Sequence, residues 1–227
     1  MGKNAGKRAS GRALKWVLAF LLAAALALLA IFLLARSGRI CITSASRPAD
    51  RYGISGDLPG MKESDKAVLE GALAYVKTRP RYRSAYYKEG YPDDGYGVCT
   101  DVTAFAMKNA GLDLQKLVDA DIAKRPGAYD ITQPDPAIDF RRVKNLQVFF
   151  RENAKPLTLD ISNISQWRGG DIVIFKNHIG IISDRRDRRG IPYVIHHSSP
   201  WQLRYEQDIL PRRGDLTGHY RVSDLRK

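Results

Sequence analysis

The hydrophobic pattern of the chain changes character twice along its length. Trp16 to Ala35 form one uninterrupted apolar run without a charged side chain, and residues 36–60 are rich in Ser, Arg, Gly and Pro without an apolar period. Beyond residue 60, helical spacing gives way to short strand-like runs near residue 170. This order predicts an apolar helix, a stalk (36–60) and one folded domain (61–227).

The first half of that domain has the spacing of amphipathic helices. Ser64 is placed as an N-cap, and Pro80 ends the first pattern. Gly111 lies just beyond the end of a predicted helix, where a left-handed backbone conformation is common and glycine is favoured. Asp113 can cap the helix that follows. Helices are expected over 64–76, 99–109, 114–124 and 143–152, with a proline-rich loop over 125–139.

The second half of the domain has the pattern of an antiparallel sheet. Apolar runs of strand length are separated by Gly-rich or charged turns. Helices first and strands afterwards predict an α+β fold in which the helices cover one side of the sheet. Strands are expected over 171–175, 178–184, 191–197 and about 203–209, and Gly218-His-Tyr-Arg-Val222 closes the chain.

Two of these strands carry histidines that can meet. If Asp184 pairs with Gly190 across the charged hairpin, His178 lies opposite His196 on one face of the sheet. A register slip of one residue would place His178 opposite His197 instead. The pattern itself leaves both pairings open.

Cys99 is the candidate nucleophile. It opens a predicted helix directly after a turn-rich segment, and the positive end of a helix dipole favours a thiolate. A thiolate, the His178 imidazole and a third polar group are the parts of a cysteine nucleophile site. A buried structural cysteine is the competing interpretation. A zinc site of Cys99, His178 and His196 fits by ligand type but lacks a short paired-ligand motif, and no cofactor motif is present.

The N-terminus has the pattern of a membrane anchor. Five basic residues precede the apolar run, whose twenty residues would rise about 30 Å as a helix. The preceding charges predict a cytoplasmic segment (1–15), a transmembrane helix (16–35) and an exported domain. A cleavable signal peptide is the alternative. The second cysteine, Cys41, would lie just past the anchor.

Charge narrows the class of partner. The formal net charge is +13; seven of the 37 basic residues and none of the 24 acidic ones lie in residues 1–41, which leaves +6 on the remainder. A basic surface suits an anionic envelope surface such as cell wall or membrane lipid. No recognition helix or aromatic-basic pattern supports nucleic-acid binding, and nothing in the sequence indicates an oligomeric state.

Several short motifs resemble known families. A cysteine at a helix start, Gly-Asp-Ile-Val-Ile-Phe, His-Ile-Gly-Ile-Ile and Tyr-Val-Ile-His resemble the NlpC-type cysteine peptidases of the papain-like superfamily. Gly-Val-Cys-Thr-Asp-Val, Leu-Asp-Leu-Gln, Phe-Arg-Arg-Val-Lys-Asn-Leu-Gln and the terminal Gly-His-Tyr-Arg are more closely similar to the exported bacterial YijF-like family, over about residues 60–223.

The resemblance implies a papain-like fold and a Cys99–His178–His196 site. It selects His196 over His197, because the family's third polar residue follows two apolar residues. It also implies a tyrosine that assists the oxyanion site, for which Tyr91 and Tyr87 are the candidates. The implied activity is extracytoplasmic hydrolysis of peptidoglycan peptide amide bonds, with no cofactor.

This chain departs from the family pattern at the nucleophile. It has Val98-Cys99-Thr100-Asp101 where NlpC enzymes usually have Asp-Cys-Ser-Gly, which puts the substrate in question more than the fold. The alternatives are a non-catalytic wall-binding domain, an acyltransferase or transglutaminase-like enzyme with the same dyad, and an interaction protein. His219 is interpreted as a structural hydrogen-bonding residue and stays outside the catalytic set.

Overall fold

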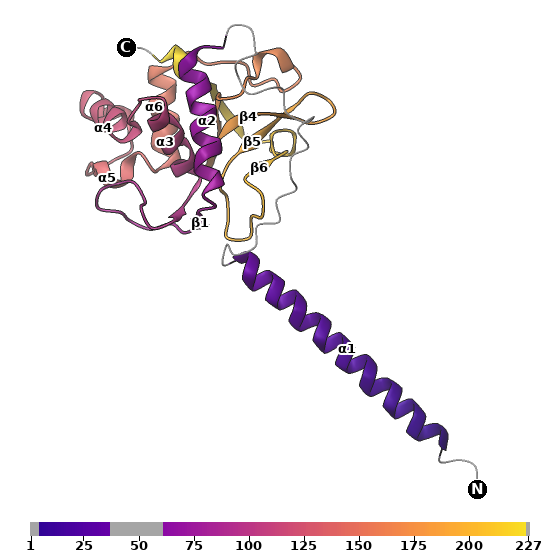
Figure 1. The fold of residues 1–227 in the computed structure, drawn as a ribbon. Coiled ribbons are helices and arrows are strands. Elements are labelled where there is room, and N and C mark those ends of the chain that lie inside the picture. The colour runs from indigo at the N-terminus through magenta and orange to yellow at the C-terminus, as the bar shows by residue number, and fades with distance from the viewer. Residues whose placement is uncertain (1–4, 37–60, 226–227) are drawn as a thin grey trace. The chain divides into compact units, whose positions relative to one another are not determined.

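The computed structural model describes residues 5–36 and 61–225 (Figure 1). The chain divides into two compact units, Met1–Ile42 and Thr43–Lys227. The predicted stalk, apart from Arg36, and Cys41 lie outside the described residues.

The first unit contains one helix, α1 (Ala5–Arg36). It begins well before the predicted start at residue 16 and continues through the basic segment. Large apolar side chains on it are exposed, among them Trp16, Phe20 and Leu28. No helix within the described ranges meets the length and apolarity required to cross a bilayer. The transmembrane anchor therefore stays a prediction.

The helices of the second unit confirm the four predicted ones to within one or two residues. The predicted 125–139 loop also contains a short helix that the pattern did not indicate. Asp135 caps it, accepting a hydrogen bond from the Ala137 N–H at 2.9 Å, and proline follows at the first helical position. The helices are α2 (Glu63–Lys77), α3 (Cys99–Asn109), α4 (Leu114–Lys124), α5 (Pro136–Asp139) and α6 (Val143–Asn153).

The predicted helix ends are confirmed at two positions and wrong at one. Gly111 has φ +77°, and the N–H groups of Gly111 and Leu112 bond back to the last turn of α3. Asp113 caps α4 by accepting from the Lys116 N–H. Ser64 is not a cap, because α2 begins one residue earlier and Lys62 takes the cap position.

A five-stranded antiparallel sheet forms the second half of the unit. Its order is β6-β5-β4-β3-β7, so β4 is central and carries His178 as its first residue. β4 is longer than predicted and contains two of the expected hairpin-tip arginines. A separate parallel pair, β1 (Arg81–Tyr82) and β2 (Tyr96–Gly97), precedes Cys99. The sheet strands are β3 (Ile172–Phe175), β4 (His178–Arg186), β5 (Pro192–Ile195), β6 (Glu206–Gln207) and β7 (Leu216–Tyr220).

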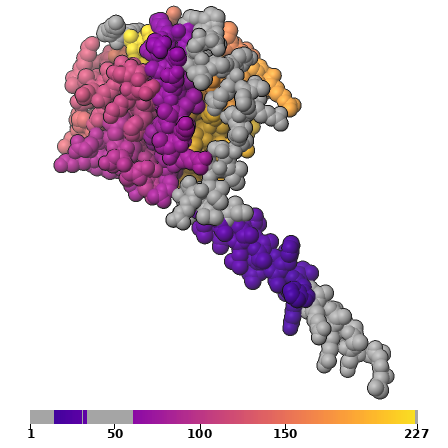
Figure 2. Space-filling view, viewed as in Figure 1, coloured from indigo at the N-terminus to yellow at the C-terminus, as the bar shows by residue number. Residues whose placement is uncertain are grey.

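Alternating residues of the sheet build two cores. Ile172, Ile174, Ile179 and Ile181 pack with the helices. The opposite face of the same two strands contributes to a smaller cluster around Trp167, through Val173, Phe175 and Ile182. Figure 1 shows the helices gathered on one side of the sheet, and in Figure 2 α2 separates them from the strand surface. The predicted α+β architecture with an antiparallel sheet is confirmed.

Candidate functional site

Cys99 is the first residue of α3 and lies against the start of β4. Val98, in extended conformation, is the N-cap, and its N–H donates to Asp101 Oδ2 at 2.8 Å. The main-chain N–H of Ile179, the residue directly after His178, is among the groups that lower the pKa of the Cys99 thiol. Packing of α3 on β4 therefore brings together two motifs that are 79 positions apart in the sequence.

A buried ion pair fixes the start of α3. Arg141 donates from Nε to Asp101 Oδ1 at 2.7 Å and from Nη2 to Oδ2 at 2.9 Å, with both side chains almost fully buried. Arg141 also donates to the carbonyl of Ala85 at 2.7 Å, and Thr100 Oγ1 donates to the Arg141 carbonyl. Asp101 is thus a structural anchor for the turn that carries Cys99.

His178 and His196 are in direct contact. His178 Nε2 lies 2.9 Å from His196 Nδ1, and the two rings are perpendicular at a centroid distance of 4.9 Å. The predicted ring–ring contact is confirmed. The register used to predict it is wrong: Ile181 pairs with Ile195 and Ile182 with Val194, two residues away from the assumed pairing. A two-residue shift keeps every side chain on its face, so the histidines still meet diagonally.

Gly180 makes this diagonal contact possible. In the observed register Gly180 lies opposite His196. A methyl group at Gly180 would come within 3.2 Å of His196 Cβ and 2.6 Å of Val194 Cγ1. The missing side chain therefore leaves room for the His196 ring. The only sign of this role in the sequence is a glycine within a strand, and no prediction was drawn from it.

Burial keeps all three histidines at this end of the sheet neutral. Desolvation lowers the pKa of His178 to about 4, and the nearby Arg213 guanidinium lowers it further, whereas Asp215 opposes both. Desolvation and His178 lower the pKa of His196 to about 3, and the Gln207 side chain opposes them. His196 Nε2 has no hydrogen-bond partner of normal geometry among the described residues. The pKa of His197 is lowered to about 4 by burial.

The resting Cys99 is a thiol rather than the thiolate that the helix position suggested. Although the residue keeps part of its surface open to solvent, desolvation around the sulfur raises its pKa to about 11. The Asp101 carboxylate raises it further, and the N–H groups of Ile179 and Thr100 oppose the rise. Burial therefore outweighs the favourable position at the helix start.

Tyr82, rather than Tyr91 or Tyr87, pairs with the segment that leads into Cys99. The pKa of Tyr82 is raised first by burial and then by the charge of Cys99. Tyr87 instead contacts Asp94, and Tyr91 donates to Asp113 at 3.0 Å. Tyr82 lies opposite Gly97 in the β1–β2 pair, a parallel pairing across a 13-residue loop that the pattern did not predict.

His219 lies in a separate structural cluster. Its ring stacks on Trp167 at 3.8 Å and contacts Asp171 Oδ2 at 2.9 Å and the Thr158 carbonyl at 2.7 Å. Arg221 binds the same Asp171 carboxylate through two hydrogen bonds. The structural interpretation of His219 agrees with this geometry.

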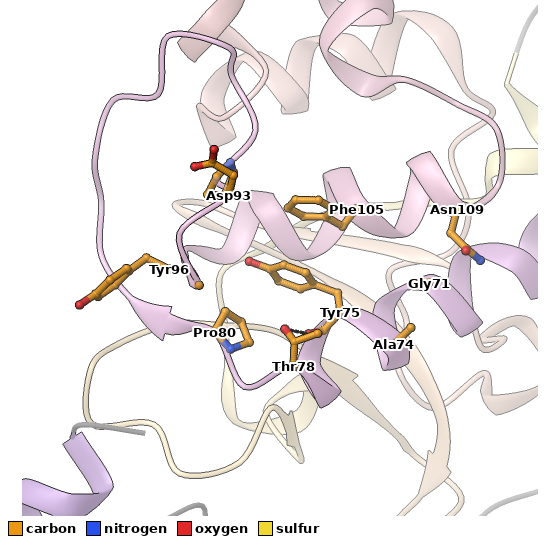
Figure 3. Close-up of a pocket in the computed structure, with 11 residues that line it drawn as sticks. Gly71, Ala74, Tyr75, Thr78, Pro80, Asp93, Tyr96, Phe105 and Asn109 are labelled. Atoms are coloured by element: carbon orange, nitrogen blue, oxygen red, sulfur yellow. Dashed lines mark hydrogen bonds between the residues drawn. The ribbon is translucent and has the colours of Figure 1, made fainter. Parts of the chain in front are cut away.

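A cavity of about 420 Å³ lies between α2 and α3, beside the turn that leads to Cys99. Tyr75 and Phe105 stack at 4.7 Å in its wall, and Figure 3 shows the Tyr75 ring between Phe105 and Pro80. The Tyr75 hydroxyl is buried without a hydrogen-bond partner among the described residues, and an added methyl group at Gly97 would overlap it.

The described side chains do not form a metal-binding cluster. No group of three or more His, Cys, Asp or Glu residues in residues 5–36 and 61–225 has the arrangement needed to hold an ion.

The comparisons with known proteins agree with the resemblance to the YijF-like family. A family described as a domain of unknown function (DUF1287) matches residues 69–222, which include Cys99, all the histidines and Tyr82. The uncharacterized protein YijF of Escherichia coli (strain K12) is 35% identical over 168 residues, covering 68% of this chain and 80% of YijF. No solved structure matched. The chain belongs to the DUF1287 family.

Proposed function

We propose that this protein is a cysteine hydrolase that cleaves amide bonds in peptidoglycan peptides. The observation that carries the proposal is the His178–His196 contact at the start of β4, the strand against which the Cys99 helix α3 packs. A thiol at a helix start beside an oriented imidazole is an arrangement suited to acyl chemistry. The domain is further proposed to have a papain-like NlpC-type fold, in keeping with its helix-borne cysteine and strand-borne histidine.

The proposed reaction begins from a neutral thiol and a neutral imidazole. His178 uses Nε2 for the contact with His196, so Nδ1 is the nitrogen left to take the Cys99 proton. The sulfur attacks the amide carbonyl, and His178 then donates the proton to the leaving amine. Water hydrolyses the thioester, releases the acid and restores the thiol. The α3 N-terminus and the Tyr82 hydroxyl are the candidate donors to the oxyanion.

Because Cys99 and His178 are both neutral at rest, alkylation is not a suitable test for a catalytic thiol. Rapid alkylation by iodoacetamide at neutral pH would indicate a preformed thiolate, but the raised pKa of Cys99 predicts slow alkylation with or without an enzymatic role. Turnover is therefore the decisive measurement.

The test uses the full chain in detergent with purified muropeptides, and mass spectrometry identifies the products. The wild type is expected to release a peptide with a new carboxylate, and Cys99→Ala is expected to release none. Cys41→Ser is the matched control and is expected to behave as wild type. Absence of cleavage by the wild type, or equal cleavage by Cys99→Ala, rejects the hydrolase and favours a wall-binding domain. Products that carry an added amine acceptor instead of water would indicate an acyltransferase.

We also propose that the domain works outside the cytoplasm, anchored by the apolar run Trp16–Ala35. The proposal is supported by the sequence pattern of five basic residues followed by twenty uncharged ones. Protease treatment of spheroplasts tests it. The domain is expected to be digested without lysis, and protection until lysis would reject the extracytoplasmic location.

A further inference from the structure

Two adjacent histidines leave β5 toward different partners. The ring of His196 contacts His178, whereas that of His197 contacts Tyr82 edge-on, at a centroid distance of 5.3 Å and an interplanar angle of 88°. Successive residues of an extended segment project to opposite sides, so the His196-His197 dipeptide contacts both His178 and Tyr82.

Tyr82 needs support from outside its own strand. β1 has two residues and pairs with β2 alone, away from the five-stranded sheet. The Tyr82 side chain is only half-buried. The orientation of the Tyr82 ring therefore depends on the rings packed against it, and the His197 ring among them is buried, with 2% of its surface exposed.

A closed circuit of contacts holds His197 in turn. Its second ring contact is with Tyr205, at a centroid distance of 5.1 Å. The Tyr205 hydroxyl donates to the Pro80 carbonyl at 2.7 Å, two residues before Tyr82. The Tyr205 carbonyl accepts from the His196 N–H at 2.9 Å. The circuit thus joins β1, the end of β5 and the segment before β6.

Strand pairing puts Tyr82 opposite Gly97, two residues before Cys99. We infer that His197 is a positioning residue that holds the Tyr82 ring beside this approach to Cys99 and so limits the access of water to the sulfur. His197 acts through the packing of its ring against the Tyr82 ring. Burial leaves His197 uncharged, and its Nδ1 has no hydrogen-bond partner among the described residues. Loss of the His197 ring frees Tyr82, admits water and lowers the pKa of the thiol. The consequence for catalysis rests on the proposed function, whereas the effect on the thiol does not.

The experiment measures the rate of Cys99 alkylation by iodoacetamide against pH, in full-length Cys41→Ser protein in detergent. His197→Ala and Tyr82→Ala are each expected to lower the titration midpoint by about one pH unit. Alkylation at pH 7.5 should then rise about threefold, because a tenfold gain in thiolate is partly offset by lower nucleophilicity. The double variant should match Tyr82→Ala alone, since both changes act through one ring.

Two variants separate positioning from general loosening. His197→Phe keeps an aromatic ring at the contact and is expected to titrate like the parent protein. His219→Phe disturbs a buried histidine elsewhere and should lower the melting temperature without moving the thiol midpoint. Additive shifts in the double variant, or a His197→Phe midpoint equal to that of His197→Ala, would overturn the inference. Because alkylation needs no substrate, that failure is distinguishable from an absence of peptide cleavage.

Discussion

His178 Nε2 and His196 Nδ1 lie 2.9 Å apart, across a strand pair in which their residues are diagonal rather than opposite. One nitrogen must donate and the other accept, so this contact selects the tautomer of both rings. With His178 Nε2 as donor, His178 Nδ1 keeps its lone pair for the Cys99 proton.

Loss of the His196 acceptor should therefore slow the proposed reaction without weakening substrate binding. His196→Ala is expected to lower kcat on muropeptides on the order of 100-fold with little change in KM, because a mispositioned base acts in the transition state. His196→Asn, whose amide oxygen can accept from Nε2, should recover part of the rate. A His196→Ala variant with wild-type kcat would contradict this role.

The stability of the protein should depend on pH at both ends of the neutral range. The pKa values of His178, His196 and His197 are about 4, 3 and 4 in the folded state, below the usual 6.5. The neutral forms thus favour folding, and this stabilisation is present above pH 6.5 and lost as the pH falls toward 4. Thermal melting should show a falling Tm across that window, less steeply in His197→Phe.

At alkaline pH the stability should fall as the pH rises, and the group responsible is the Cys99 thiol. Burial raises the pKa of Cys99 from 9.0 to about 11, so the neutral thiol favours the folded state. That contribution is present below pH 9 and is lost as the pH rises toward 11. A smaller alkaline fall in Tm is expected for Cys99→Ala, and equal falls in both proteins would contradict it.

Gly180→Ala should disable the site through a single methyl group. The added carbon would meet the Ile195 carbonyl oxygen at 2.8 Å and His196 Cβ at 3.2 Å, so His196 must move. We expect a loss of about 1–3 kcal/mol in the free energy of unfolding and a fall in kcat. Gly127→Ala is the matched control, because its added carbon would meet nothing within 4 Å. Equal effects of the two substitutions would contradict the packing argument.

Breaking the buried Asp101–Arg141 pair should cost more than breaking an exposed one. Asp101→Asn leaves the Arg141 guanidinium buried without its counter-charge, and we expect a loss of about 3–5 kcal/mol. Asp130→Asn, at the exposed pair with Lys144, should change the free energy of unfolding by less than about 1 kcal/mol. Urea denaturation followed by circular dichroism measures both, and similar losses would contradict the argument.

Local chemistry was sufficient to predict most elements of the domain. The turn before Cys99 and the left-handed Gly111 mark the ends of α3, and the side chain of Asp113 marks the start of α4. These signals act within a few residues, so they are readable without the rest of the chain. The short α5 was missed because prolines that suggested a loop also start a helix.

The hairpin shows why a correct contact came from a wrong register. The assumed and observed registers differ by two residues, and a shift of two keeps each side chain on its face, so His178 still meets His196. A shift of one would have brought His197 to that face, and the strand pattern alone did not distinguish the two. The pairing between Ile182 and Arg186 shifts at an irregularity, and the alternation of the strands gives no sign of it. The register therefore depended on tertiary packing.

The sequence by itself determined the α+β order of elements and the helix start at Cys99, because each follows from local propensity or period. Only the tertiary structure decided that His196 rather than His197 contacts His178, and that Tyr82 rather than Tyr87 or Tyr91 pairs with the segment before Cys99, since both depend on strand register. It also decided that Cys99 rests as a neutral thiol. Desolvation is set by everything that packs around the sulfur, and here it outweighs the local effect of the helix end.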